Sequence, residues 1–259
     1  MNIVVCVKQV PDTATERRLR PGEGTLDRAT PDGLINELDE YAIEEGLRIA
    51  EAHEGEVTIL SMGPAKAAES IRKALSMGAD KAIHVVDDGL AGSDALATSY
   101  AIAQVLEETG FDLVITGSES TDARMGVLAA MLAERLGVPQ LTLASKVDID
   151  GTRITVRRVS DEGFDEVEAS LPAVVSVMEK INEPRYPSFK GIMAAKKKPV
   201  STIGISDLGL DASEVGLEGS LVQVDSFAPR PPKSGGQKVE DEGDGGRKIA
   251  EFLVGQKLI

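Results

Sequence analysis

The 259-residue sequence has no tryptophan, one cysteine and two histidines, and aromatic residues make up only 3% of it. A single cysteine, Cys6, excludes a disulfide framework and a multi-cysteine metal site. His53 and His84 lie far apart in the sequence, which argues against a histidine-based zinc site. Hydrophobic residues still make up 42% of the chain, mostly Ala, Val, Leu and Ile. This profile favours a sheet covered by helices over an aromatic-packed β-sandwich.

Long hydrophobic runs and an excess of positive charge are also missing. No apolar run approaches the ~20 residues of a membrane span, and the N-terminus has no signal-peptide pattern, so we expect a cytoplasmic protein. The net charge is −15. Because phosphate neutralisation needs an excess of Lys and Arg, this charge argues against nucleic acid as a partner.

The motifs of several enzyme classes are absent. No G-x-G-x-x-G follows the first apolar run, and neither G-x-x-x-x-G-K-[ST] nor G-x-S-x-G occurs. The many carboxylates fall mainly on polar helix faces, where solvation explains them. These absences favour a binding or carrier protein without catalytic residues.

Short apolar runs alternate with helical patterns in the first half of the chain. The runs predict strands over 2–7, 56–62, 81–87 and 111–118, and the patterns between them predict helices over 36–55, 63–80, 93–110 and 123–137. Asn36 and Ser93 are the expected N-caps of the first and third helices. The alternation predicts an α/β fold with an open, mostly parallel, Rossmann-like sheet and helices on both faces.

The alternation of strand and helix patterns ends after residue 138. Asp150-Gly151 and a further turn at 161–163 predict added antiparallel strands. A strand is expected over 220–227, a Pro/Gly-rich linker over 228–246 and a short helix over 246–258. We therefore expect an α/β domain (1–182), a basic, proline-containing segment with a short helix (183–199) and an extended C-terminal arm (200–259). Two interpretations of the arm stay open: partial disorder, or packing on another subunit.

The turn "TGSESTDARMG" (116–126) is the most informative loop after a predicted strand. Its glycine, hydroxyls and aspartate lead into a helix, which suits the binding of an anion. Capping of that helix by Ser120, Thr121 and Asp122 explains the same residues equally well.

Five segments occur in an order that carries a family resemblance. They are "VCVKQVPD", "INELDEYAIEEGLRIAE", "LSMGPAKAAESIRKALSMGADKAIHV", "LPAVVSVMEKINEPRYPSFKGIMAAKKKP" and "KIAEFL". Together they strongly resemble the β-subunits of electron transfer flavoproteins, a family that includes FixA, over essentially the whole chain. The resemblance implies a heterodimeric electron carrier.

In such a carrier the α-subunit holds most of the FAD, and the β-subunit binds a structural AMP and lays its arm on the α-subunit. The resemblance implies that acyl-CoA dehydrogenases and related flavin dehydrogenases of fatty acid oxidation donate the electrons. It also implies that a membrane quinone oxidoreductase accepts them in a transient complex. The two alternatives are a bifurcating complex with a second FAD in place of AMP, and an adenine-nucleotide-binding enzyme of the same α/β architecture, such as an ATP pyrophosphatase. The second alternative needs a Gly/Ser-rich loop after the first strand, and "KQVPDTA" is not one.

The resemblance also assigns residues. It implies an AMP pocket made of Cys6, Asn36, Glu37, Leu38, Asp39, Met62, Gly117, Ser120, Thr121, Asp122, Ala123, Arg124, Met125 and Gly126. The 117–126 loop is shorter here than in mitochondrial members of the family. For Arg124, binding of the phosphate and simple solvation both stay open. Thr13 and Leu38 occupy positions close to the flavin that are often aromatic in relatives. Their replacement by non-aromatic residues argues against stacking of this chain on the flavin. For Leu38 two roles stay open: an apolar contact near the flavin, or packing of its own helix.

The loop "RYPSFKG" corresponds to the family's partner-recognition loop, with Tyr186, Phe189 and Lys190 as docking residues. Phe189 takes the position of an apolar anchor that enters a pocket of the dehydrogenase. Without the family context, Phe189 packed against its own domain is equally plausible. The lysines at 196–198 are expected to cap the short helix and to steer acidic partners.

Overall fold

The computed structural model describes residues 1–228, 230–232, 235–236 and 238–259. Contacts divide the chain into a unit of Met1–Asp225 and a unit of Ser226–Ile259. Four residues of the predicted linker (229, 233–234 and 237) lie outside the described residues. Residues 200–225, which the sequence assigned to the arm, belong to the first unit, because Ile205, Leu208 and Val215 are buried in its core.

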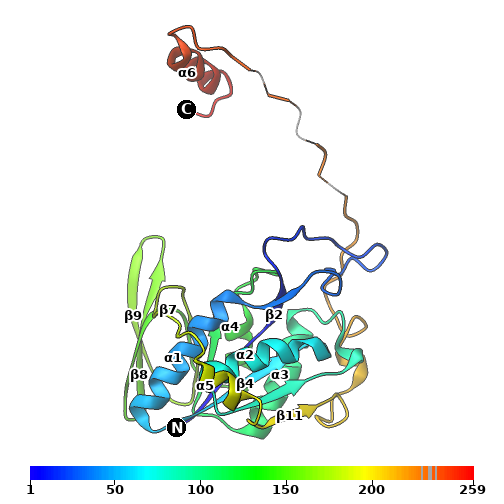
Figure 1. The fold of residues 1–259 in the computed structure, drawn as a ribbon, viewed down its shortest axis with the longest axis vertical. Helices are drawn as coiled ribbons and strands as arrows, with labels where there is room; N and C mark the ends of the chain where they lie inside the picture. The colour runs from blue at the N-terminus through cyan, green and yellow to red at the C-terminus, as the bar shows by residue number, and fades with distance from the viewer. Residues whose placement is uncertain (229, 233–234, 237) are drawn as a thin grey trace. The chain divides into compact units, whose positions relative to one another are not determined.

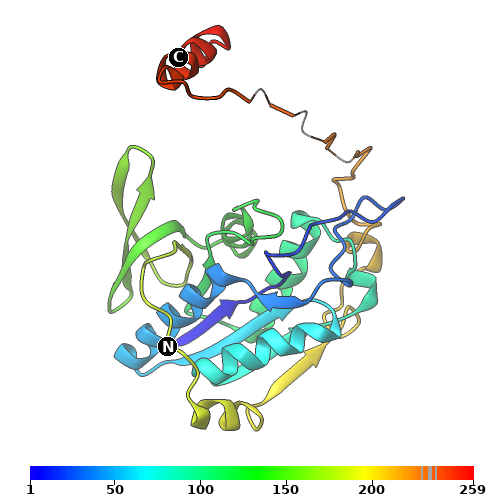
Figure 2. The same ribbon diagram turned by 45° about the horizontal axis from the view of Figure 1, so that its top comes forward.

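A nine-stranded sheet forms the centre of the first unit, in the order β11-β5-β4-β1-β6-β10-β7-β8-β9 (Figure 1). The first seven of these run parallel, while β8 and β9 add an antiparallel extension. The predicted α/β fold with an open, mostly parallel sheet and added antiparallel strands is therefore confirmed. Figure 2 shows the β8–β9 hairpin reaching beyond the helical layers.

The strands are β1 (Asn2–Cys6), β2 (Gln9–Pro11), β3 (Gly33–Ile35), β4 (Glu56–Met62), β5 (Lys81–Val85), β6 (Leu113–Gly117), β7 (Gln140–Asp150), β8 (Arg153–Ser160), β9 (Gly163–Ser170), β10 (Ala173–Val177) and β11 (Val200–Ile203). The helices are α1 (Glu37–His53), α2 (Ala68–Met77), α3 (Ala95–Thr109), α4 (Leu128–Leu136), α5 (Phe189–Ala195) and α6 (Gly245–Gly255), with 3₁₀ turns at Ala65–Ala67, Asp88–Leu90 and Ala212–Glu214. Among the described residues, no helix has the length and apolarity needed to cross a membrane.

Helices cover both faces of the sheet, which explains why its central strands are continuous apolar runs. On one face Ile43 of α1 and Leu75 of α2 pack against alternate residues of β1 such as Val5. On the other face Leu106 of α3 and Leu132 of α4 pack against the intervening residues. All five are buried.

Several sequence predictions were wrong in detail. Asp94, not Ser93, caps α3, since its carboxylate accepts the N–H of Ala97 (2.9 Å). The fourth helix begins at Leu128 rather than 123, because Arg124 and Gly126 adopt left-handed φ values of 50° and 65° that no helix tolerates.

The predicted strand over 220–227 does not form either. The backbone N–H groups of Leu221 and Val222 donate to the Asp94 carboxylate instead of to a neighbouring strand. The free edge of β5 is taken by β11, a strand that the sequence analysis missed together with the small β2–β3 pair.

Strand β1 lies between β4 and β6 at the point where the strand order reverses. In open α/β sheets the carboxyl ends of the strands on either side of such a point border the ligand crevice. Here those ends are the segments that follow Cys6 and Gly117.

Candidate functional site

The carboxyl ends of β1 and β6 meet the start of α1 at this crevice. Asp39, in the first turn of α1, accepts the backbone N–H of Lys8 through Oδ2 (2.8 Å) and the amide of Asn36 through Oδ1 (2.9 Å). Gly117 ends β6 so close to α1 that a Cβ there would lie 2.6 Å from Asp39 Oδ1. A glycine is therefore required at 117 to let these two elements touch.

Asp39 is a buried carboxyl group, only 6% exposed. Burial raises the pKa of Asp39 to about 7, against the opposing effect of the N–H donors of Lys8, Asn36 and Gly117. Cys6 lies nearby, and burial together with the Asp39 charge raises the pKa of its thiol to about 12. The thiol is therefore neutral and adds an apolar surface rather than a nucleophile.

Asn36 holds the 117–126 loop in place. Its amide donates to the carbonyl of Glu119 (2.9 Å), and its Oδ1 accepts the N–H of Thr121 (3.1 Å). It stands at the N-cap position of α1, as predicted, but its side chain makes no capping hydrogen bond. Asn36 therefore fixes the loop instead of the helix end.

Asp122 forms a three-residue charge cluster with two cations. Its carboxylate accepts from Lys8 Nζ (2.8 Å) and from Arg28 Nε (2.8 Å), and its side chain is 1% exposed. Burial alone would raise the pKa of Asp122, but the two cations hold it at about 2. Lys8 Nζ also donates to Ser120 Oγ (3.2 Å).

The cluster changes the expected role of Asp122. It neither caps α4, which begins six residues later, nor offers a free carboxylate. It positions two basic side chains that stay partly exposed at the mouth of the crevice.

The remaining sequence-predicted residues lie around this core. Cys6 and Met62 end the adjacent strands β1 and β4, and Leu38 is half-buried where α1 meets Gly117. A second group is exposed to solvent: Thr13, Glu37, Ala123, Arg124, Met125 and Gly126. The last four of these follow Asp122 directly and form the rim of the crevice. Among the described residues Arg124 has no side-chain hydrogen bond or ion pair.

Sequence reasoning missed Lys8 and Arg28. Lys8 follows the first strand directly, so a cation at a strand's carboxyl end was a usable signal. Arg28 belongs to the polar 12–32 segment and meets Asp122 from 94 positions away, which no local pattern reveals.

The expected docking residues lie in another part of the unit. Tyr186 is 96% exposed and Phe189 is 81% exposed, so Phe189 is not packed against its own domain. Lys190 is exposed beside them. Lys198 does not cap α5; its Nζ donates to the carbonyls of Leu75, Gly78 and Ala79 at the end of α2 (2.6–3.1 Å).

Comparison with known proteins gives matches along the whole chain. The model of the electron transfer flavoprotein domain family matches residues 23–208. The electron transfer flavoprotein subunit beta of Mycobacterium tuberculosis is 53% identical, over 100% of this chain and 99% of the relative. The chain belongs to the electron transfer flavoprotein β-subunit family.

More distant relatives extend this result. The electron transfer flavoprotein subunit beta of Megasphaera elsdenii is 36% identical over the full length of both chains. Protein FixA of Azorhizobium caulinodans is 39% identical over 88% of this chain and 85% of its own. The family match covers Arg28, the 117–126 loop and the segment around Phe189, whereas Cys6, Lys8 and Thr13 precede its first residue.

Proposed function

We propose that this chain is the β-subunit of a heterodimeric electron carrier that accepts electrons from acyl-CoA and related flavin dehydrogenases and passes them to a membrane quinone oxidoreductase. The observation that carries the proposal is the full-length match to electron transfer flavoprotein β-subunits. The FAD is held mainly by the α-subunit and supplies the redox chemistry when bound. This chain contributes a nucleotide crevice, an arm on the α-subunit and a docking segment.

In this proposal the AMP binds in the crevice between β1 and β6. Thr121 Oγ1 is buried there without a hydrogen-bond partner among the described residues, as expected for a group that awaits a ligand. Lys8 and Arg28 would face the phosphate, with Asp122 as their positioning residue. Cys6, Leu38 and Met62 supply apolar surface, and the rim residues Ala123–Gly126 border the opening.

The docking role rests on exposure and shape. Phe189, Ile192 and Met193 stand at positions i, i+3 and i+4 of α5, and each is at least 46% exposed. Three such side chains form one apolar ridge on a helix surface. The exposed lysines at 190, 196 and 197 border this ridge on a chain of charge −15, which suits an apolar pocket with an acidic rim on the dehydrogenase.

Phe189→Ala tests the docking role directly. With the chain co-produced with its α-subunit, reduction of the bound flavin by an acyl-CoA dehydrogenase is followed by absorbance. We expect the KM for the carrier to rise roughly tenfold or more, since a buried aromatic anchor contributes ~2 kcal/mol or more. FAD content should stay unchanged, and an unaltered KM would contradict the docking role.

A further inference from the structure

The segment that carries Phe189 is fixed at both of its ends. On its N-terminal side, Arg185 donates two hydrogen bonds to the Glu44 carboxylate of α1, from Nε (2.7 Å) and Nη2 (3.0 Å). Nη1 of Arg185 also donates to Glu51 (2.6 Å), about two turns further along the same face of α1. Glu44 is buried and also accepts the backbone N–H of Arg185 (3.1 Å), so this end is held by both main chain and side chain.

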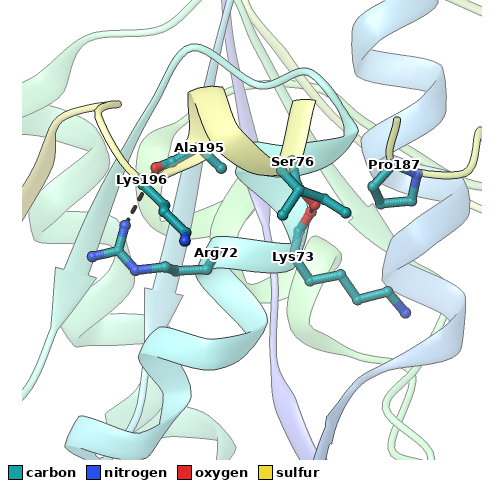
Figure 3. A pocket seen from close by; sticks show the side chains of 7 residues that line it. Arg72, Lys73, Ser76, Pro187, Ala195 and Lys196 are labelled. Atoms are coloured by element: carbon teal, nitrogen blue, oxygen red, sulfur yellow. Dashed lines mark hydrogen bonds between the residues drawn. The ribbon is translucent and has the colours of Figure 1, made fainter. Parts of the chain in front are cut away.

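The C-terminal end is held by α2. Lys198 donates three hydrogen bonds, to the carbonyl of Leu75 in the last turn of α2 and to those of Gly78 and Ala79 just beyond it, where cations are also favoured by the helix dipole. Arg72 of α2 donates to the carbonyl of Ala195 (3.3 Å), the last residue of α5, and Figure 3 shows this bond beside the pocket between the two helices.

The middle of the segment, helix α5, is also held in place by close contacts. Ser188 caps α5 by accepting the N–H of Gly191 (3.0 Å). Gly191 lies against α2, where a Cβ would come within 2.5 Å of the Ser76 carbonyl. Ala195 is buried in the core. The exposed ridge is therefore carried on a helix that has little freedom to move.

We propose that Arg185 and Lys198 are positioning residues for electron transfer: they clamp the two ends of the 183–198 segment so that α5 presents Phe189 to a flavin dehydrogenase in a single orientation. This inference rests on the proposed docking role of Phe189. The clamp lowers the ordering cost of docking, because the segment is arranged before the partner arrives. Neither clamp residue has to touch the partner.

The test uses the purified complex with its α-subunit and an acyl-CoA dehydrogenase. Arg185→Lys keeps the charge but cannot reproduce the two parallel N–H bonds, and Lys198→Met keeps the apolar stem but loses all three donors. Each should raise the KM for the carrier roughly fivefold to tenfold while the limiting rate and FAD content stay within about twofold. The matched control is Arg153→Lys, which alters two surface ion pairs of β8, with Asp150 and Glu168, and should leave KM unchanged.

A double-variant measurement separates positioning from a general structural role. In the Phe189→Ala background, Arg185→Lys should add less than a twofold effect on KM, because the clamp acts through Phe189. Hydrogen exchange of the amides of residues 189–195 should be faster in both clamp variants and unchanged in Phe189→Ala.

The outcomes distinguish the inference from the proposal beneath it. An unchanged KM in Arg185→Lys, with a raised KM in Phe189→Ala, overturns the clamp alone. Additive effects in the double variant, or a raised KM in Arg185→Lys without one in Phe189→Ala, also overturn it. An unchanged KM in both Arg185→Lys and Phe189→Ala overturns the docking role and the clamp together.

Discussion

Asp39 and Asp122 are two carboxylates at the same edge of the sheet whose surroundings move their pKa values in opposite directions. Burial dominates for Asp39 and raises its pKa to about 7. For Asp122 the cations Lys8 and Arg28 outweigh burial, so its pKa is about 2. Asp122 is therefore charged throughout the physiological range, whereas Asp39 changes its charge within it.

The raised pKa of Asp39 predicts a pH-dependent stability. The folded-state pKa of about 7 lies above the ordinary 3.8, so the folded protein binds more protons between these values. The stability that this group contributes is full below about pH 4 and is lost as the pH rises through 7, by about 1.4 kcal/mol for each pKa unit.

Asp39→Asn removes this titration. Thermal unfolding of the complex is compared between wild type and Asp39→Asn from pH 5 to 7.5. The variant's midpoint should rise relative to the wild type as the pH increases across this range. Parallel pH profiles would show that the Asp39 carboxyl titrates at an ordinary value.

At the scale of elements, the sequence predicts the strands that are buried on both faces, because nearly all of their residues are apolar. The central strands β1, β4 and β6 are buried along nearly their whole length, so their runs of apolar residues are unambiguous. Strand β11 is short and has exposed residues at its middle, and β2 and β3 have three residues each. Such strands depend on tertiary pairing and leave little periodicity to read.

The candidate site divides in the same way. Family resemblance places residues at the strand ends, and the structure brings Asn36, Asp39 and the 117–122 segment together. The Arg28–Asp122 pair and the bonds of Lys198 to α2 join residues about 90 to 120 positions apart. These contacts arise from the packing of whole elements, so no local pattern predicts them.

The close contact of α5 with α2 predicts a specific sensitivity at Gly191. In Gly191→Ala the added methyl group would meet a backbone carbonyl, which cannot rotate away as a side chain could. We expect α5 to shift outward at a cost of about 1–3 kcal/mol. The midpoint of thermal unfolding should fall and the KM for the dehydrogenase should rise.

Gly246→Ala is the control for this prediction, since a Cβ there meets no heavy atom within 4 Å. It should leave the KM unchanged and should not lower the midpoint of thermal unfolding, because alanine is favoured over glycine inside a helix. A Gly191→Ala complex with wild-type KM and midpoint would mean that α5 does not depend on this contact.

At the scale of the whole molecule, the nucleotide crevice and the docking segment are separate. Asp39 lies in the first turn of α1 at the crevice, and Glu44 and Glu51, which bind Arg185, lie five and twelve residues further along the same helix. At 1.5 Å per residue these two positions are roughly 8 and 18 Å from Asp39 along the helix axis. Changes in the docking segment should therefore leave the nucleotide in place, and changes in the crevice should leave the apolar ridge intact.

The nucleotide content of the purified heterodimer tests the central proposal most directly. The complex is denatured, and the released nucleotides are separated by chromatography and quantified against protein. We predict one FAD and one AMP per heterodimer, with AMP lowered by Lys8→Met with Arg28→Met and FAD kept in Phe189→Ala. Two FAD and no AMP per heterodimer would contradict the account of a simple electron carrier.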